Sequence, residues 1–257
     1  MTAPAGPGPV VPRQRSWPRH RCPGVALDLG SDRTRAWMSG RRTILDVPTV
    51  TFPGAAPSYP VRRGTIVDSD GTARMLHRLL GHRLPRVGRP LLILTTPALG
   101  GTSYRTAARA AVQVLRPRTV LTVPTARAVA AATGADLSRP LLVLDLGAQL
   151  TEVTLLVDGA VTDARTTALG TSDLDGRTPA SRICDAVVAM VSAMLEQDRT
   201  VQTLDALRRG ALLAGGGALR PDLTYPLAGR LHAPVRPVPA PHTAAVRGAA
   251  SLLRNAD

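Results

Sequence analysis

Val-Ala-Leu-Asp-Leu-Gly at positions 25–30 and Leu-Val-Leu-Asp-Leu-Gly at positions 142–147 are the strongest indication of the fold of this chain. Each stretch is typical of an apolar strand that ends near an aspartate, Asp28 or Asp145, and opens a glycine turn. Backbone N–H groups in such a turn can cradle phosphate oxygens, and a carboxylate at the strand end can hold a hydrated divalent cation. One Asp-x-Gly turn is common in proteins. Two copies predict two related lobes that face one phosphate site.

The segments that follow each turn have the same order. The first half shows strand patterns over 25–29, 34–38 and 43–47, a helix over 72–80, a strand over 91–94, a helix over 103–115, a strand over 120–123 and a helix over 125–133. The second half shows strands over 141–146, 151–157 and 161–167, helices over 182–195 and 204–209, strands over 211–214 and 235–238, and a helix over 243–254. This repeat predicts an α/β protein with two lobes around a cleft.

The composition limits the classes of partner. The chain has 257 residues, a net charge of +14, and only arginine among its 32 strongly basic residues. A basic surface favours acidic proteins or an anionic membrane face. Nucleic acid is disfavoured, because the arginines are dispersed and aromatic residues make up only 2% of the chain, which leaves no stacking platform. The two cysteines lie far apart and suggest neither a disulfide framework nor a zinc site, which fits a cytoplasmic location.

Two segments bear on membrane contact. Residues 1–22 form a Pro/Arg-rich stretch that we expect to be a disordered tail. Its segment 13–21 offers Trp17 and four arginines to an anionic lipid surface, but Pro18 interrupts any continuous amphipathic helix. The longest apolar stretch, 183–195, is too short to span a bilayer. We therefore expect no transmembrane segment.

Three glycine motifs resemble those of the actin/Hsp70 superfamily, and most closely those of the MreB/Mbl-like bacterial actin homologues, the rod shape-determining family. Residues 26–34 resemble the first phosphate motif, residues 145–153 the second, and residues 214–219 the adenosine motif. Further matches at 48–50, 62–68 and 233–249 fall in the family's order. The resemblance extends from about residue 24 to residue 253 and implies two actin-like (RNase H-like) lobes, IA and IIA, around a nucleotide cleft.

The resemblance implies ATP and Mg²⁺ as cofactors. Asp28 and Asp145 would be vestigial catalytic residues and would hold Mg²⁺ through water. The other positions that match nucleotide-contacting residues of the family are Gly30, Ser31, Thr34, Gly147, Thr151, Gly215, Gly216 and Gly217.

Two departures from the family concern whole subdomains. A short loop between Phe52 and Tyr59 stands where the family has subdomain IB, and a few residues between Asp175 and Ser181 replace subdomain IIB. We therefore predict a truncated form with a shallow cleft. Lobe IA would span residues 23–138, completed by the C-terminal helix 243–257, and lobe IIA would span residues 139–242.

Other departures concern the phosphate chemistry. Ala148 and Gln149 replace glycines of the second phosphate motif, and Leu150 replaces a threonine. Asp32 adds a carboxylate to the first motif, partly offset by Arg33. The family's water-orienting glutamate is missing from the aligned stretch 127–129. Since phosphoryl transfer depends on oriented water and compensated phosphate charge, we expect a degenerate ATPase that binds nucleotide better than it hydrolyses it.

These observations leave three hypotheses open. The first is a truncated MreB-like cytoskeletal or scaffold protein in bacterial cell-shape or cell-wall morphogenesis, with weak or vestigial ATP binding. Its partners would be morphogenesis and cell-wall proteins, an anionic membrane surface at the inner face of the cell membrane, and further copies of itself. The second is a monomeric actin-fold ATPase switch. The third is a pseudo-ATPase adaptor, which Ala148 and Gln149 favour over the second.

Overall fold

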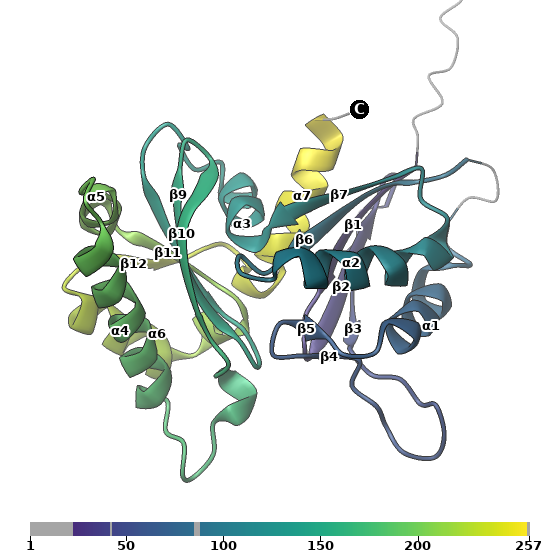
Figure 1. The fold of residues 1–257 in the computed structure, drawn as a ribbon, viewed down its shortest axis with the longest axis horizontal. Helices are drawn as coiled ribbons and strands as arrows, with labels where there is room; N and C mark the ends of the chain where they lie inside the picture. Colours follow the sequence, from purple (N-terminus) through teal and green to yellow (C-terminus); the bar gives the residue numbers. More distant parts are fainter. Residues whose placement is uncertain (1–22, 42, 85–87, 256–257) are drawn as a thin grey trace, which may run out of the picture.

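The structure is a computed structural model that describes residues 23–41, 43–84 and 88–255. It contains two five-stranded mixed sheets that lie beside one another, each covered by helices (Figure 1). The α/β class predicted from the sequence is confirmed. The predicted tail, residues 1–22, lies outside the described residues. Within those ranges, no helix is long and apolar enough to cross a membrane.

The first sheet has the strand order β3-β2-β1-β6-β7. Its strands are β1 (Gly24–Leu29), β2 (Arg33–Met38), β3 (Leu45–Pro48), β6 (Leu91–Thr96) and β7 (Thr119–Pro124). The first three strands form an antiparallel meander, and β6 and β7 continue the sheet in parallel with β1. Strands β1 and β6 occupy the centre because their side chains are apolar on both faces.

The second sheet repeats this plan in the order β10-β9-β8-β11-β12. Its strands are β8 (Leu141–Leu146), β9 (Thr151–Val157), β10 (Ala160–Thr167), β11 (Ala211–Ala214) and β12 (Val235–Pro237). The antiparallel meander and the parallel extension have the same directions as in the first sheet. The strand that carries the Asp-x-Gly turn is central in both sheets, so the duplication visible in the sequence is also a duplication of topology.

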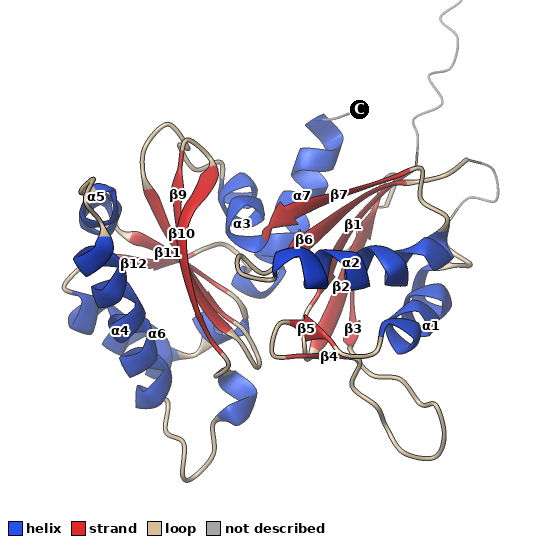
Figure 2. Cartoon of the chain, viewed as in Figure 1, coloured by secondary structure: helices blue, strands red, loops and turns tan. Residues whose placement is uncertain are grey.

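Helices cover both faces of each sheet (Figure 2). On the first sheet, α1 (Ser69–Leu80) and α2 (Gly101–Val112) pack on one face, and α7 (Ala244–Asn255) packs on the other. On the second sheet, α4 (Ser181–Gln197), α5 (Gln202–Arg209) and α6 (Pro221–Leu231) pack on one face, and α3 (Thr125–Thr133) packs on the other. We call the first sheet with α1, α2 and α7 the first lobe, and the second sheet with α4, α5 and α6 the second lobe.

One helix and one small hairpin were not predicted from the sequence. Helix α6 was missed because Pro226 lies inside it, although its buried leucines recur every four residues at Leu223, Leu227 and Leu231. The small hairpin of β4 (Val61–Arg62) and β5 (Thr65–Ile66) was also missed, since each strand has only two residues. The remaining elements are the short 3-10 helices η1 (Gln113–Leu115), η2 (Thr171–Asp173), η3 (Gly216–Leu219) and η4 (Pro241–Thr243).

Helices α3 and α7 cross at very close range between the two sheets. A Cβ atom placed on Gly248 of α7 would lie 1.6 Å from the carbonyl oxygen of Ala128 in α3. Only glycine fits there without a shift of backbone against backbone. Because α3 packs on the second sheet and α7 on the first, this crossing sets how closely the two sheets approach.

We expect Gly248→Ala to lower the free energy of unfolding by about 1–3 kcal/mol, as overpacking does in cores, although alanine is the better helix former. Gly229→Ala in α6 is the matched control, since nothing lies within 4 Å of the new methyl group. It should stabilise the protein by up to about 1 kcal/mol. Chemical denaturation measures both changes. A Gly248→Ala protein as stable as the Gly229→Ala protein would mean that α3 and α7 are not in close contact.

Candidate functional site

A cleft of about 180 Å³ lies between the two lobes. Most of the site residues predicted from the sequence line it together: Asp28, Gly30, Ser31, Asp145, Gly147, Gly215 and Gly216. They come from the ends of β1, β8 and β11 and from the turns that follow these strands. The duplicated topology therefore brings the two predicted aspartates to one site. This site lies at the carboxyl ends of the strands, where ligands bind in open α/β sheets.

The two glycine turns have the same construction. The Gly30 amide donates to the Arg33 carbonyl at 3.0 Å, and the Gly147 amide donates to the Leu150 carbonyl at 2.9 Å. A Cβ atom on either glycine would lie 2.7 Å from the carbonyl oxygen that closes its turn. Glycine is therefore required in both turns by the chain's own hydrogen bond, independently of any ligand.

The negative charge of Asp28 is compensated in part by groups of the first lobe. Its carboxylate accepts a hydrogen bond from the Thr95 hydroxyl at 2.7 Å and lies 3.7 Å from Nη1 of Arg35. Arg35 stands directly opposite Asp28 in the antiparallel pairing of β1 with β2. Burial raises the pKa of Asp28, and the charge of Arg35 opposes this shift only in part.

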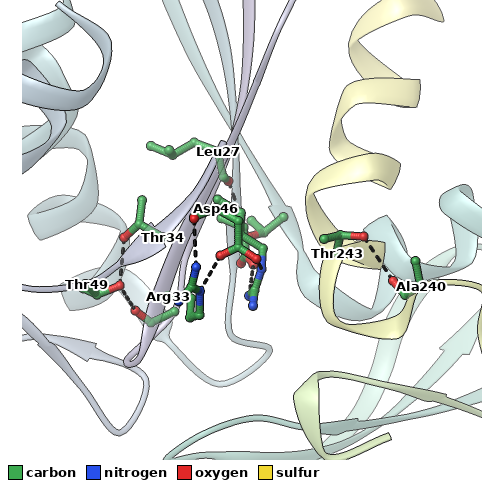
Figure 3. A network of polar contacts seen from close by, with 11 residues as sticks. Leu27, Arg33, Thr34, Asp46, Thr49, Ala240 and Thr243 are labelled. Carbon is green, nitrogen blue, oxygen red and sulfur yellow. Dashed lines mark hydrogen bonds and ion pairs between the residues drawn. The ribbon is translucent and has the colours of Figure 1, made fainter. Parts of the chain in front are cut away.

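Asp46 of β3 lies opposite Arg35 on the other side of β2, so Asp28, Arg35 and Asp46 form a row across three strands. Figure 3 shows the contacts of Asp46. Its carboxylate lies 3.2 Å from Nε of Arg35 and 2.6 Å from Nε of Arg33. Burial opposes ionisation of Asp46, but the hydrogen bond from Arg33 and the two arginine charges outweigh it and lower its pKa. Arg33, which was expected to offset Asp32, is thus held by Asp46 instead.

The second lobe places a different partner opposite its aspartate. Asp145 pairs across the strands with Glu152 of β9, a second acid where the first lobe has Arg35. Burial raises the pKa of Asp145 to about 7 and that of Glu152 to about 8, and in each case a neighbouring acid adds to the shift. Burial and the charges of Asp28 and Glu152 also raise the pKa of Tyr104, which lines the same cleft.

Glu152 also connects the two lobes. Its Oε1 accepts a hydrogen bond from the backbone amide of Ala98 at 2.9 Å, and Ala98 follows β6 of the first sheet. Glu152, Arg35, Thr95 and Tyr104 were not predicted as site residues from the sequence. The alternation of side chains along β2 and β9 was the available signal for Arg35 and Glu152, because it places each of them beside an aspartate once the strand pairing is known.

The third glycine motif lies directly against Asp145, the aspartate of the second lobe. Gly215 has φ +82°, and a Cβ atom there would lie 2.4 Å from the Leu146 carbonyl oxygen and 2.5 Å from Oδ1 of Asp145. Both the backbone conformation and the space require glycine. At Gly216, by contrast, a Cβ atom would meet nothing within 4 Å, so the cleft is open on this side.

Three of the predicted residues hold the loops instead of lining the cleft. The Thr34 hydroxyl lies 2.9 Å from the Thr49 hydroxyl, which donates to the Gly30 carbonyl at 2.7 Å (Figure 3). The Thr151 hydroxyl donates to the Leu169 carbonyl at 2.8 Å. Gly217 packs against Leu146. Both threonine hydroxyls therefore have partners within the protein, and the chain of hydrogen bonds from Thr34 through Thr49 reaches the first glycine turn.

Several groups that line the cleft are already engaged by other parts of the protein, which leaves few of them free for a triphosphate with its metal. The cleft, about 180 Å³, is smaller than ligand pockets of about 300–1,000 Å³. Asp28 is held by Arg35 and Thr95, and the Gln149 side chain accepts a hydrogen bond from the Arg63 amide. Among the residues that the structure describes, no group of three or more His, Cys, Asp or Glu side chains is placed to hold a metal ion. The side around Gly216 is the more open part of the cleft.

Two sheets of this order, joined around a cleft with paired Asp-x-Gly turns, define the actin-like fold. The structure is similar to that of MreB5 of Spiroplasma citri bound to ADP, with a TM-score of 0.79 and 14% identity over 92% of this chain and 97% of the other. It is also similar to MamK in a double helical filament, with a TM-score of 0.76 and 14% identity over 91% and 98% of the two chains.

A third similar structure is the ethanolamine utilization protein EutJ from Carboxydothermus hydrogenoformans, with a TM-score of 0.64 and 15% identity over 90% of this chain and 89% of the other. No family model and no curated protein sequence matches the chain. At these identities the structural likeness establishes the fold, and the resemblance to MreB-like actin homologues is confirmed at that level.

The buried Glu152 predicts a pH dependence of stability. Its pKa in the folded protein, about 8, lies above its ordinary value of 4.5, so the folded state retains the proton where the unfolded chain loses it. The free energy of unfolding should fall as the pH rises from about 4.5 to about 8 and level off above that. Glu152→Gln should reduce this fall by at least about 1.4 kcal/mol, the equivalent of one pKa unit.

Denaturation curves at a series of pH values measure this effect. The control is Glu196→Gln, which changes the chain's only other glutamate, an exposed residue of α4. That control should retain the wild-type slope. If the Glu152→Gln protein has the same slope as wild type, Glu152 is not buried as a protonated acid.

Proposed function

We propose that this chain is a truncated MreB-like cytoskeletal or scaffold protein in bacterial cell-shape or cell-wall morphogenesis, with weak or vestigial ATP binding. Its fold is similar to that of MreB5, a protein crystallised with ADP and with AMPPNP, and of MamK, which is described as a double helical filament. The observation that carries the proposal is that both Asp-x-Gly turns persist while the groups around them bind one another.

The proposed truncation is supported by the two short connections. The β3–β4 connection, 49–60, is a loop closed by an isolated bridge between Thr51 and Ser58. In the second lobe, residues 174–180 link η2 to α4. These are the places where subdomains IB and IIB would be inserted, and their absence would remove the upper walls of the nucleotide cleft.

Weak hydrolysis follows from the groups that remain. Arg127, at the aligned position of the family's water-orienting glutamate, is exposed on α3. Glu152 reaches the cleft, but its carboxylate is bound to the Ala98 amide and has a pKa of about 8. A group that stays protonated at neutral pH is a poor base for activating water. Asp28 and Asp145 would therefore shape the site, and nucleotide turnover would be slow or absent.

The partners proposed for the scaffold follow from charge. The net charge of +14 favours acidic proteins and anionic lipid, and the location proposed from it is the cytoplasm, at the inner face of the membrane. Self-association is proposed from the filament formed by MamK. The pseudo-ATPase adaptor remains the second candidate, and the engagement of Gln149 by Arg63 favours it.

Sedimentation tests the proposal. We expect the protein to pellet as an assembly with or without ATP and Mg²⁺, and to pellet more with liposomes containing phosphatidylserine than with neutral ones. The additional pelleting with phosphatidylserine liposomes should be lost at about 1 M salt, where the screening length is about 3 Å. If the protein stays monomeric under all of these conditions, the scaffold role is contradicted. The pseudo-ATPase adaptor would then be the favoured function. Pelleting that requires ATP and is abolished by Asp145→Ala would contradict the vestigial site.

A further inference from the structure

The tip of the β4–β5 hairpin in the first lobe lies on the second glycine turn, across the cleft. The backbone amide of Arg63 donates to Oε1 of Gln149 at 3.2 Å. Gly64 packs against Leu150 so closely that a Cβ atom on this glycine would lie 2.7 Å from Cδ2 of Leu150. Gln149 and Leu150 are the two residues whose long side chains depart from the second phosphate motif, and here both contact the other lobe.

The Arg63 side chain makes a second set of contacts with the same lobe. Its Nη2 lies 2.7 Å from Oδ1 of Asp173, and its Nη1 donates to the carbonyl of Ala168. An exposed ion pair alone contributes little to stability. Here one residue uses its backbone amide, a carbonyl contact and a carboxylate contact together, which fixes the geometry of the hairpin tip against the second lobe.

Both sides of this contact are anchored in their own lobes. The hairpin strands place Val61 and Ile66 in the core of the first lobe. On the other side, the Thr171 amide donates to the Gly147 carbonyl at 3.0 Å and the Ser172 amide donates to the Ala148 carbonyl at 2.7 Å. The loop that carries Asp173 is thus hydrogen-bonded to the second glycine turn. A contact between two anchored segments restrains the lobes themselves.

The hairpin turn has a backbone shaped for this position. Arg63 has φ +47° and Gly64 has φ +73°, the left-handed pair of a two-residue turn of the primed type. Glycine adopts this conformation freely, but arginine does so at a cost. Contacts of Arg63 with Gln149, Ala168 and Asp173 offset that cost, and all of them lie in the other lobe.

We propose that Arg63 and Gly64, together with Gln149, Leu150 and Asp173, form an internal clasp that holds the two lobes together without nucleotide. The hydrogen bond from Ala98 to Glu152 is a second bridge deeper in the cleft. In this arrangement the protein's own hairpin and the Gln149 amide occupy the phosphate side. The clasp does not depend on the scaffold role, since it concerns one chain, whether assembled or not.

Interlobe distances measured by pulsed electron spin resonance test the clasp. Spin labels would be attached at the exposed positions Arg78→Cys in α1 and Arg208→Cys in α5, in a Cys22→Ser background. We expect one narrow distance distribution without nucleotide, unchanged by ATP and Mg²⁺. Arg63→Ala should broaden this distribution. Hydrogen exchange at the hairpin amides should become about tenfold faster or more, because the contacts that restrain this segment are lost.

Arg62→Ala is the matched control, because Arg62 contacts Tyr59 within the first lobe and should leave the distribution narrow. Asp173→Asn removes the negative charge that Arg63 contacts in the second lobe. It replaces Arg63→Ala in this experiment if that variant fails to fold. A broad wild-type distribution that narrows only with ATP would overturn the clasp. So would a narrow distribution that neither Arg63→Ala nor Asp173→Asn changes. Neither result depends on whether the protein sediments as an assembly.

Discussion

Three acids share one cleft, the buried Glu152 and the partly buried Asp28 and Asp145, and the need to compensate their charge governs the chemistry of the site. Burying an ionised carboxylate is costly unless a cation, hydrogen bonds or a proton accompanies it. Burial raises the pKa of all three acids, to about 7 for Asp145 and about 8 for Glu152, but only Asp28 has a cation, Arg35, opposite it and a hydrogen bond from Thr95. The first lobe thus meets this need with an arginine, whereas in the second lobe Asp145 and Glu152 retain their protons to a higher pH than exposed acids do.

The two lobes have kept their topology and changed their chemistry. Position for position, Asp28 faces Arg35 and Asp145 faces Glu152 across equivalent pairs of antiparallel strands. Both glycine turns close through equivalent hydrogen bonds, so the backbone of the two turns is the same. The side chains around that backbone now bind one another: Thr34 with Thr49, Thr151 with Leu169, and Gln149 with Arg63. The result is an actin-like cleft whose polar groups are satisfied largely from within.

Much of this fold could be predicted from the sequence, because the strands are strongly apolar and each glycine turn follows directly from its strand. The cleft residues Asp28 and Asp145 were found for the same reason. Arg35 and Glu152 could not be selected without the strand register, which decides the face to which each side chain points. The contact of Glu152 with Ala98, and that of Arg63 with Asp173, join segments far apart in the chain. Local sequence patterns carry no signal for such interlobe contacts. The prediction of Thr34 and Thr151 as nucleotide contacts rested on the resemblance alone, and it stays a prediction.

Sequence motifs do not show the partners of their side chains, and Gln149 illustrates this. Its substitution for glycine suggested an obstructed phosphate loop, and the structure gives its side chain a specific partner, the Arg63 amide. The hydroxyls of Thr34 and Thr151 likewise have intramolecular partners. A motif thus identifies which backbone is present, while the partners of its side chains depend on the tertiary fold.

Calorimetric titration with ATP and Mg²⁺ would decide whether the second glycine turn still serves a phosphate. The wild-type protein would be compared with a variant that carries the family's residues in this loop, Ala148→Gly, Gln149→Gly and Leu150→Thr. We expect the wild type to bind no tighter than about millimolar and the variant at least about tenfold tighter, a gain of about 1.4 kcal/mol. Micromolar binding by the wild type, unchanged in the variant, would contradict the proposed weak binding of phosphate.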